Sequence, residues 1–528
     1  MSNSDLAIII LAAGKGTRMK SDSPKVMHTL AGKPMINWLI ETSEQLNPKK
    51  IITVIGPDMP ALEEAVAPHE TAIQKDRNGT GGAVKCALPT LKDFKGKVLI
   101  LMGDEPLVEL SVLKALAEND GLAVQGFDTL APAGLGRMLL NQDGTLDKIV
   151  EDRDCSDEQK RISLCNAGNY CVPAEHLEGW INQIGNDNAQ GEYYLTDLPA
   201  IAVKDGHKTQ VVRSNWIGPW GINDRIQLAF HEKLLQVRLR EKALLEGVSM
   251  IDPDSVTFHH DTKIAAGAVV DTNVFFGPEV TIESGVHIKS FCHLEGTHVK
   301  AGTTVGPFAR LRPGSEISED VKIGNFVEIK KSSIGKGSKI SHLAYVGDTD
   351  MGENVNFSCG AITVNYDGFD KHKTKIGNNV MVGSNVNLVA PVILEDGAFA
   401  AAGSTITKDV DADSLAISRI DTDVKKGWAA RFRKIKNAAK IKMLFVMVLV
   451  ASSPSQACEG FKNSMTALEA AVANHQIEQQ RQAQNQKPTL PHLRSLNEDL
   501  DALEKAVADY HAQKARQQAV PAAPSPKM

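Results

Sequence analysis

The sequence of 528 residues lacks the marks of several protein classes. Its seven cysteines are scattered and form no CxxC pair, which argues against a disulfide or zinc framework and favours a cytoplasmic protein with reduced thiols. The formal net charge is −6, so no overall positive field exists and nucleic acid is not an expected partner. The first residues enter an apolar strand pattern without a basic-then-apolar leader, so no export signal is expected there.

A small-residue loop near the start is the most informative stretch. The apolar run of residues 7–10 predicts a buried strand, and residues 11–19 (LAAGKGTRM) follow it directly. Small residues let backbone N–H groups approach a phosphate closely, and Lys15, Arg18 and Lys25 supply balancing positive charge. The spacing differs from that of a Walker A loop, which ends in Gly-Lys-Ser/Thr. On its own, such a loop is also compatible with an ordinary surface turn.

The first part of the chain, to about residue 225, alternates strand-like and amphipathic helical runs. This alternation predicts a mostly parallel sheet with helices on both faces, which binds ligands beyond the carboxyl ends of its strands. Asp104 follows the strand predicted at residues 98–102 and takes such a position. A carboxylate beside a triphosphate suits Mg²⁺, although Asp104 could instead cap a helix before Pro106.

A six-residue period dominates the second half. Three runs of apolar residues follow it: Ile264, Val270, Phe276, Ile282, Ile288 and Leu294; Val299, Val305, Leu311, Ile317, Ile323 and Ile329; and Ile376, Val382, Leu388 and Leu394. This period predicts a parallel β-helix, in which three hexads form one triangular coil and stacked coils bury the apolar residues. We expect the breaks near residues 299, 334 and 346–375 to be projecting loops that carry function.

Residues suited to anion binding or acid–base catalysis gather at those breaks. Basic residues occupy positions within 310–312, 330–331 and 371–373, and His342 stands between them near Asp348. A histidine near a carboxylate can act as a general base at neutral pH, whereas a lone histidine on a coil can be an ordinary surface residue.

Several short motifs, taken in order along the chain, resemble those of one family, the bifunctional N-acetylglucosamine-1-phosphate uridyltransferases/glucosamine-1-phosphate acetyltransferases. The resemblance covers about residues 5–430 and lies in residues 11–19, 79–82 (GTGG), 134–137 (GLGR), 190–197 (QGEYYLTD), 221–223 (GIN), 306–314 (GPFARLRPG) and 324–331 (GNFVEIKK). It implies an α/β fold with a Rossmann-like nucleotidyltransferase domain, followed by a left-handed parallel β-helix (hexapeptide repeat) domain. It also implies a homotrimer that uses Mg²⁺, acetyl-CoA and UTP to make UDP-N-acetylglucosamine for cell-envelope polymers.

In the N-terminal half, the resemblance implies nucleotide and sugar contacts from Leu11, Ala12, Ala13, Gly14, Lys25, Gln74, Gly79, Thr80, Met102, Gly103, Asp104, Gly136, Glu151, Asn166 and Asn223. Asp104 and Asn223 would hold the metal, and Arg18 and Lys25 would neutralise charge during transfer. No covalent nucleophile is needed, because the incoming phosphate oxygen is itself the nucleophile.

In the C-terminal half, the resemblance makes His342 the base that takes a proton from the sugar amine, with Glu328 as the partner that orients the imidazole. The sugar phosphate would be bound with the help of Arg312, Lys330, Tyr345, Asn356 and Lys371. Acetyl-CoA would contact Cys359, Asn365, Tyr366, Ser384, Ala402 and Arg419.

Three positions depart from the family's usual residues. Cys359 stands where the family commonly has alanine, Ala167 where it has serine or threonine, and Met102 where it often has tyrosine. We expect these departures to affect fine specificity more than reaction class.

The expected domains are 1–225 (uridyltransferase), 226–250 (linker helix), 251–442 (acetyltransferase β-helix) and 443–528 (an atypical tail). Residues 425–442 carry eight basic residues and no acid, which suits a solvated helix face or, by the resemblance, contact with CoA phosphates. Residues 443–451 form a signal-like apolar segment too short to span a membrane, and membrane association is expected only if it acts as such.

The rest of the tail predicts a helical hairpin, from one apolar stripe at Phe461, Met465, Leu468 and Val472 and another between Leu493 and Tyr510. We interpret the tail as a fused small secreted reading frame; an ordinary extension is the alternative. For the whole chain, two functional alternatives stand beside the bifunctional enzyme: a uridyltransferase whose β-helix is only a scaffold, and a nucleotide-sugar binding protein without turnover.

Overall fold

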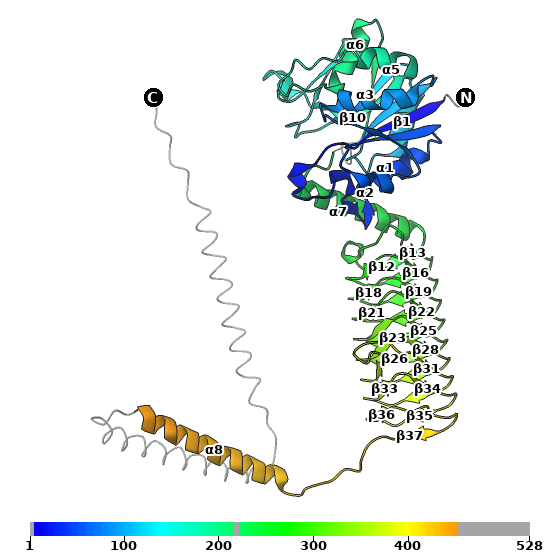
Figure 1. The fold of residues 1–528 in the computed structure, drawn as a ribbon, viewed down its shortest axis with the longest axis vertical. Helices are drawn as coiled ribbons and strands as arrows, with labels where there is room; N and C mark the ends of the chain where they lie inside the picture. The colour runs from blue at the N-terminus through cyan, green and yellow to red at the C-terminus, as the bar shows by residue number, and fades with distance from the viewer. Residues whose placement is uncertain (1–4, 215–220, 452–528) are drawn as a thin grey trace. The chain divides into compact units, whose positions relative to one another are not determined.

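The computed structural model describes residues 5–214 and 221–451, which fall into two compact units that divide after Ile420. The first unit contains an α/β domain, drawn in blue to green in Figure 1, and a stack of short strands drawn in green to yellow. The second unit contributes one helix to the described residues, α8 (Trp428–Ala451).

One mixed sheet forms the centre of the α/β domain. Its strand order is β5 (Glu70–Ile73), β4 (Lys50–Ile55), β1 (Leu6–Leu11), β6 (Lys97–Met102), β10 (Leu164–Pro173), β7 (Leu122–Asp128), β11 (Thr209–Arg213), β9 (Leu146–Val150) and β8 (Arg137–Leu140). Residues 7–10 of β1 are fully buried, as the apolar run requires, because helices cover both faces of the sheet.

Two helical layers enclose this sheet. Helices α3 (Thr80–Ala87), α5 (Ala174–Ile181) and α6 (Leu198–Lys204) pack on the face that includes Ile9. The face that includes Ile8 and Ile10 packs against helices α1 (Met35–Glu44), α2 (Pro60–Ala65), α4 (Leu110–Glu118) and α7 (Arg225–Leu245). The layered α/β prediction is thereby confirmed.

The sheet is parallel from β5 to β6, but β10 runs antiparallel to both β6 and β7. The edge strands β8 and β9 form a hairpin, and the chain then passes through a short 3-10 helix (Gln159–Arg161) into β10. Strand β11 again runs parallel to β7, so this half of the sheet is mixed.

The predicted linker, residues 226–250, is helical over most of its length, as part of α7. Asp224 caps α7 by accepting a hydrogen bond from the Gln227 N–H, at 2.9 Å. The helix ends before Gly247, whose φ of +95° suits glycine, and residues 249–250 already form a strand. The expected single helix over residues 226–250 is therefore shorter than predicted at its C-terminal end.

Among the described residues, the second half forms three parallel sheets that wrap around one core, the triangular β-helix that the hexad period predicts. One sheet contains β12 (Ser249–Met250), β14 (Val269–Val270), β17 (His287–Ile288), β20 (Thr304–Val305), β23 (Lys322–Asn325), β26 (Lys339–His342), β29 (Asn356–Phe357), β32 (Met381–Val382), β35 (Phe399–Ala400) and β37 (Leu415–Ala416). The second contains β13 (Lys263–Ile264), β16 (Val280–Ile282), β19 (Thr297–Val299), β22 (Ser315–Ile317), β25 (Ser332–Ile334), β28 (Thr349–Met351), β31 (Thr374–Ile376) and β34 (Val392–Leu394). The third contains β15 (Phe275–Phe276), β18 (His293–Leu294), β21 (Arg310–Leu311), β24 (Glu328–Lys330), β27 (Tyr345–Gly347), β30 (Ile362–Val364), β33 (Asn387–Val389) and β36 (Thr405–Ile406).

Two of the predicted projecting loops are wrong. At residues 299 and 334 the chain is already in strands β19 and β25, which pair with their neighbours on both sides. The hexad register slips because these coils are one residue shorter: Lys263 pairs with Thr281, but Val280 pairs with Thr297. The coil is shortened by one residue at a tight corner at Gly296, where an added Cβ would lie 2.7 Å from the Pro313 backbone. Only the third break contains an inserted loop, at residues 365–373.

The signal-like apolar segment, residues 443–451, forms the last part of helix α8, and the predicted tail hairpin lies outside the described residues. Across residues 5–214 and 221–451, no helix is both long and apolar enough to cross a membrane.

Candidate active sites

The first candidate site lies at the carboxyl end of β1 and β6. A cavity of about 250 Å³ opens there, and it is lined by the predicted residues Leu11, Ala12, Ala13, Gly14, Lys25, Gln74, Gly79, Thr80, Met102 and Asp104. An added Cβ on Gly14 would meet nothing within 4 Å, so the loop is open toward the cavity. Gly103 holds the two strand ends together by donating its N–H to the Leu11 carbonyl, at 3.0 Å.

Four predicted polar residues converge beside this cavity. The Lys25 ammonium forms an ion pair with Asp104 and donates to the Asn223 side-chain oxygen at 3.1 Å. Arg18 donates to that same oxygen at 2.9 Å. Gly221 lets the chain pass close by, because an added Cβ would lie 2.8 Å from an Asp104 carboxylate oxygen. The Asp104 and Asn223 oxygens thus already face one cation, the Lys25 ammonium, and this donor set fits the oxygen ligands that Mg²⁺ prefers.

Glycine is required where the helix α3 begins. Gly79 has a φ of +106°, and an added Cβ would lie 2.6 Å from the Tyr193 carbonyl oxygen. The Gln74 amide donates to the Gly79 carbonyl at 2.9 Å, and the Thr80 hydroxyl accepts the Leu195 N–H at 3.0 Å. These contacts bind the 74–80 loop to the 190–197 segment on the cavity's edge.

A second group of predicted residues forms at the start of β10. Asn166 donates its N–H to the Gly136 carbonyl at 2.9 Å, and an added Cβ on Gly136 would lie 3.7 Å from a Glu151 carboxylate oxygen. Burial raises the pKa of Glu151, and the hydrogen bond from Thr196, at 3.0 Å, opposes that rise. These residues are the expected sugar contacts, and they connect to the cavity through Gly168, whose Cβ position lies 2.8 Å from the Met102 side chain.

Two features of this site were not predicted from the sequence. Arg77 lines the cavity and donates to the Ala13 carbonyl at 2.8 Å. Glu105 is buried beside Asp104, and Asn169 donates to it at 2.7 Å; burial raises the pKa of Glu105 well above its ordinary value. Asn169 also accepts the Met102 N–H at 3.1 Å, so this pair supports the end of β6. In the sequence, the signal for Glu105 is a second acidic residue directly after Gly103 and Asp104.

The second candidate site spreads along the β-helix around His342, at the exposed end of β26. Its Nδ1 lies 2.6 Å from the Asn325 side-chain oxygen, and the two residues are paired on neighbouring strands. The expected partner Glu328 does not take this place: it accepts a hydrogen bond from Arg312 at 2.7 Å. Coil stacking explains the difference, because Asn325 stands directly beneath His342 whereas Glu328 belongs to the next sheet.

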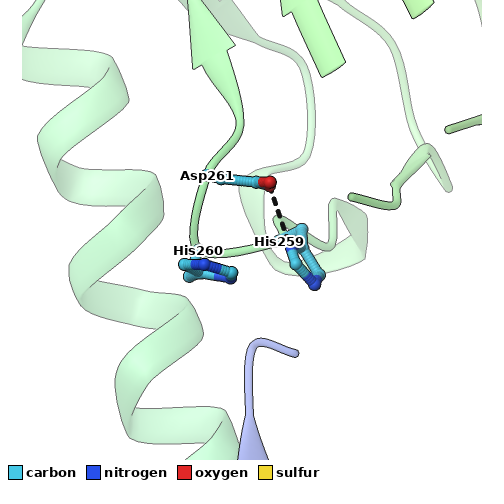
Figure 2. Close-up of side chains that lie close together, drawn as sticks. All are labelled: His259, His260 and Asp261. Carbon is cyan, nitrogen blue, oxygen red and sulfur yellow. Dashed lines mark hydrogen bonds and ion pairs between the residues drawn. The ribbon is translucent and has the colours of Figure 1, made fainter. Parts of the chain in front are cut away.

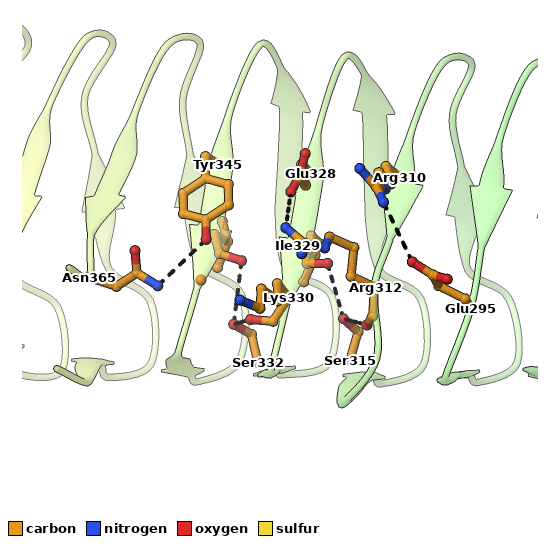
Figure 3. A network of polar contacts seen from close by, with 12 residues as sticks. Glu295, Arg310, Arg312, Ser315, Glu328, Ile329, Lys330, Ser332, Tyr345 and Asn365 are labelled. Carbon is orange, nitrogen blue, oxygen red and sulfur yellow. Dashed lines mark hydrogen bonds and ion pairs between the residues drawn. The ribbon is translucent and has the colours of Figure 1, made fainter. Parts of the chain in front are cut away.

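Basic residues of neighbouring coils, among them Arg312 and Lys330, lie close to one another on the β-helix (Figure 3). Lys330 lies beside Lys371 of the inserted loop; the Lys371 ammonium lowers the pKa of Lys330, and desolvation and the Arg312 guanidinium act in the same direction. The corners that present Arg312 and Lys330 are held from inside by serines: the Ser315 hydroxyl donates to the Arg312 carbonyl at 2.6 Å, and the Ser332 hydroxyl to the Lys330 carbonyl at 2.8 Å. Clustered cations held in this way form a suitable anion site.

Polar residues continue from this cluster. The Asn365 amide donates to the Tyr345 hydroxyl at 3.5 Å and also to Asp348. Asn356 on β29 donates to the Ser358 hydroxyl at 2.9 Å, and the Tyr366 hydroxyl donates to the Gly368 carbonyl at 2.6 Å within the inserted loop. Of these residues, Tyr345, Asn356, Asn365 and Tyr366 are the ones predicted for substrate binding.

The residues predicted for acetyl-CoA follow one another on successive coils. Gly360 donates its N–H to the His342 carbonyl at 3.2 Å, and the Asn385 N–H binds the Cys359 carbonyl at 2.9 Å. Further along, the Gly403 N–H binds the Ser384 carbonyl at 2.8 Å, and Arg419 donates to the Ala402 carbonyl. This column begins at His342 and runs toward the C-terminal end of the coil stack.

Comparisons with known proteins agree with this geometry. Residues 8–148 match the model of the MobA-like NTP transferase domain. The chain is 47% identical over 448 residues to the bifunctional protein GlmU of Paramagnetospirillum magneticum, which covers 84% of this chain and 100% of that protein. It is 45% identical over 436 residues to the GlmU of Paracoccus denitrificans (82% and 98% covered). The GlmU of Zymomonas mobilis is 42% identical over 438 residues (81% and 97% covered). The chain therefore belongs to the family of bifunctional GlmU proteins, enzymes that combine an acetyltransferase and a uridyltransferase in one chain.

Proposed function

We propose that the two candidate sites carry out consecutive steps in making UDP-N-acetylglucosamine. The β-helix site transfers an acetyl group from acetyl-CoA to glucosamine 1-phosphate. The α/β site then joins the product to UTP and releases pyrophosphate. The observation that carries this proposal is the convergence of Arg18, Lys25, Asp104 and Asn223 beside the cavity at the carboxyl end of β1 and β6.

In the α/β site, an oxygen of the sugar phosphate attacks the α-phosphorus of UTP, and the bond to pyrophosphate breaks. Lys25 and Arg18 neutralise the charge that accumulates on the phosphates. Asp104 and Asn223 would hold Mg²⁺, which supplies Lewis-acid stabilisation of phosphate oxygens when bound. Gln74 and the 79–82 loop bind the uracil side, and Glu151, Asn166 and Gly136 bind the sugar.

In the β-helix site, His342 acts as the general base. The Asn325 oxygen accepts a hydrogen bond from Nδ1–H, which leaves Nε2 as the proton acceptor. Nε2 takes a proton from the sugar amine as the amine attacks the thioester carbonyl, and the bond to the CoA sulfur breaks. Arg312, Lys330 and Lys371 bind the sugar phosphate, with Tyr345 and Asn356 on the sugar.

The donor is bound along the column of corners that leads away from His342. Asn365 and Tyr366 lie at the acetyl end, and Cys359, Ser384, Ala402 and Arg419 contact the rest of acetyl-CoA. The supporting observation is that hydrogen bonds to the Cys359, Ser384 and Ala402 carbonyls connect successive coils, the last of them from the Arg419 side chain.

We also propose a homotrimer in which a neighbouring copy covers the acetyltransferase site. Phe291, Phe308 and Phe326 are 52%, 45% and 55% exposed and stack along one corner of the coils, with ring centroids 4.9 and 5.1 Å apart. Leu343, beside His342, extends this apolar ladder and is 58% exposed. Such a continuous exposed apolar ladder is typical of a protein interface.

A cytoplasmic location is supported by the thiols. Within the part of the chain that the structure describes, every cysteine is unpaired: Cys86, Cys155, Cys165, Cys171, Cys292 and Cys359.

A paired assay tests the two-site proposal. The purified chain receives glucosamine 1-phosphate, acetyl-CoA, UTP and Mg²⁺, and the released CoA thiol and pyrophosphate are measured separately. We expect both products from the wild type, thiol alone from Asp104→Ala, and pyrophosphate from His342→Ala only when N-acetylglucosamine 1-phosphate is supplied. A wild type that releases pyrophosphate from supplied N-acetylglucosamine 1-phosphate but never releases thiol would show that the β-helix is a scaffold.

A further inference from the structure

Two histidines and an aspartate lie together on the first coil of the β-helix, far along the chain from either candidate site. They are the consecutive residues His259, His260 and Asp261, shown in Figure 2. One potential ligand atom from each residue lies within 4.8 Å of the others. The two imidazole rings have centroids 4.4 Å apart and are tilted by 50°.

The ligand atoms are already partly organised. His259 Nδ1 and an Asp261 carboxylate oxygen are 2.6 Å apart, and the other Asp261 oxygen accepts the Glu279 N–H at 3.0 Å. The carboxylate is therefore oriented toward the His259 ring. These two atoms are close enough to bind one metal ion after a small outward movement.

His260 completes the cluster. Its Nδ1 lies 3.3 Å from the Ala31 carbonyl, which leaves Nε2 as the nitrogen available to a ligand. Two imidazoles and one carboxylate are a donor set that suits zinc and similar transition metals.

The cluster stands where the β-helix meets the hairpin β2 (Thr29–Leu30) and β3 (Lys33–Pro34) of the α/β domain. The His260 backbone N–H donates to the Ala31 carbonyl at 2.9 Å. Gly32 lies directly against the His259 ring, since an added Cβ would be 1.7 Å from its Nε2. Because Gly32 covers Nε2, His259 can offer only Nδ1, the atom that now faces Asp261. This hairpin follows Lys25–Met27, the short helix that carries the nucleotide-site lysine.

We propose that His259, His260 and Asp261 bind one transition-metal ion of the zinc class. The ligand atoms are His259 Nδ1, His260 Nε2 and an Asp261 oxygen, with water completing a tetrahedral shell. The ion fastens the first coil of the β-helix in the position that holds the 29–34 hairpin. Its role is structural, because no candidate substrate residue belongs to the cluster.

Cobalt(II) provides the test, because it replaces zinc and gives visible absorption bands that report its ligands. The untagged full-length chain is treated with a chelator, dialysed against excess Mg²⁺ to saturate the nucleotide site, and titrated with Co²⁺. We expect one Co²⁺ per chain with the intense bands of a four-coordinate site. Both His260→Gln and Asp261→Asn should abolish these bands. His298→Gln, a matched change at a half-exposed β-helix histidine that pairs with Glu283, should retain them.

A second measurement separates binding from misfolding. Zn²⁺ should raise the thermal midpoint of the wild type and of Asp104→Asn by a few degrees, but not that of His260→Gln, whose midpoint without metal should match the wild type. The proposal is overturned if the wild type shows no bands, or if His260→Gln and Asp261→Asn retain them. It is also overturned if Asp104→Asn abolishes them, because the metal would then belong to the nucleotide site.

Discussion

The two candidate sites are assembled in opposite ways. In the α/β domain, a sheet edge brings together residues from distant parts of the chain, and Lys25, Asp104 and Asn223 contact one another within a single copy. In the β-helix, residues follow in sequence order along stacked coils, and His342 stays exposed at the end of its strand. A crossing point of chain segments can make a complete pocket, whereas a straight stack makes only an open surface.

This difference predicts that the first site works within one chain and the second depends on a neighbour. The apolar ladder of Phe291, Phe308 and Phe326 is the surface that a neighbour would cover. Changes in the sheet-edge site should therefore affect one activity directly, and changes in the ladder should affect the other activity through assembly.

The largest effect is expected at Lys25. Lys25→Ala removes the ammonium that faces both Asp104 and Asn223, so we expect uridyl transfer to fall about a thousandfold. Acetyl transfer should not change. Lys49→Ala is the matched control, since Lys49 pairs with Asp5 on the surface. Pyrophosphate release measures the first activity and thiol release the second; a loss of both would contradict the independence of the sites.

Phe308→Asp should impair the β-helix site and leave the α/β site active. A charge in the middle of the aromatic ladder cannot be buried without a partner, so we expect the proposed trimer to dissociate and acetyl transfer to fall about a hundredfold. Uridyl transfer should persist. Light scattering measures the mass, and Phe369→Asp on the exposed inserted loop serves as control. A trimeric variant with normal acetyl transfer would rule out this interface.

Lys330→Ala should raise the KM for glucosamine 1-phosphate about tenfold to a hundredfold, because it removes one charge-assisted contact to the phosphate. Lys373→Ala, which removes a surface partner of Asp350, is the control. The pKa of Lys330 is lowered by Lys371, so Lys330 loses its charge at a lower pH than an ordinary lysine. The wild-type KM should accordingly rise with increasing pH below the usual lysine range, and Lys330→Ala should lack this rise.

The smallest effect concerns the orientation of His342. Asn325→Ala removes one hydrogen bond to Nδ1, and we expect kcat for acetyl transfer to fall about twofold to tenfold. Combined with His342→Ala, it should cause no further loss. Glu328→Gln should act through Arg312 and change KM rather than kcat. If instead Glu328→Gln lowers kcat and Asn325→Ala changes only KM, Glu328 is the partner that orients the imidazole.

The sequence predicted the parts that repeat or that lie within a few residues of one another. The hexad period in residues 264–394 determined the triangular coils, because every sixth side chain must be buried. The small-residue loop at residues 11–19 and the strand before it determined the open edge of the cavity. The prediction of loops at 299 and 334 failed, because a one-residue slip looks like an interruption in sequence but fits within a shortened coil.

By itself, then, the sequence determined the kind of scaffold on which the residues predicted for phosphate, sugar and thioester chemistry stand. Only the tertiary structure decided which of them touch. The stacking of coils gave His342 the partner Asn325 instead of Glu328, and the return of β10 placed Asn169 against the buried Glu105. The physical reason is that periodicity and composition act locally along the chain, whereas a hydrogen-bond partner is chosen by which segments the packed core brings within 3 Å of each other.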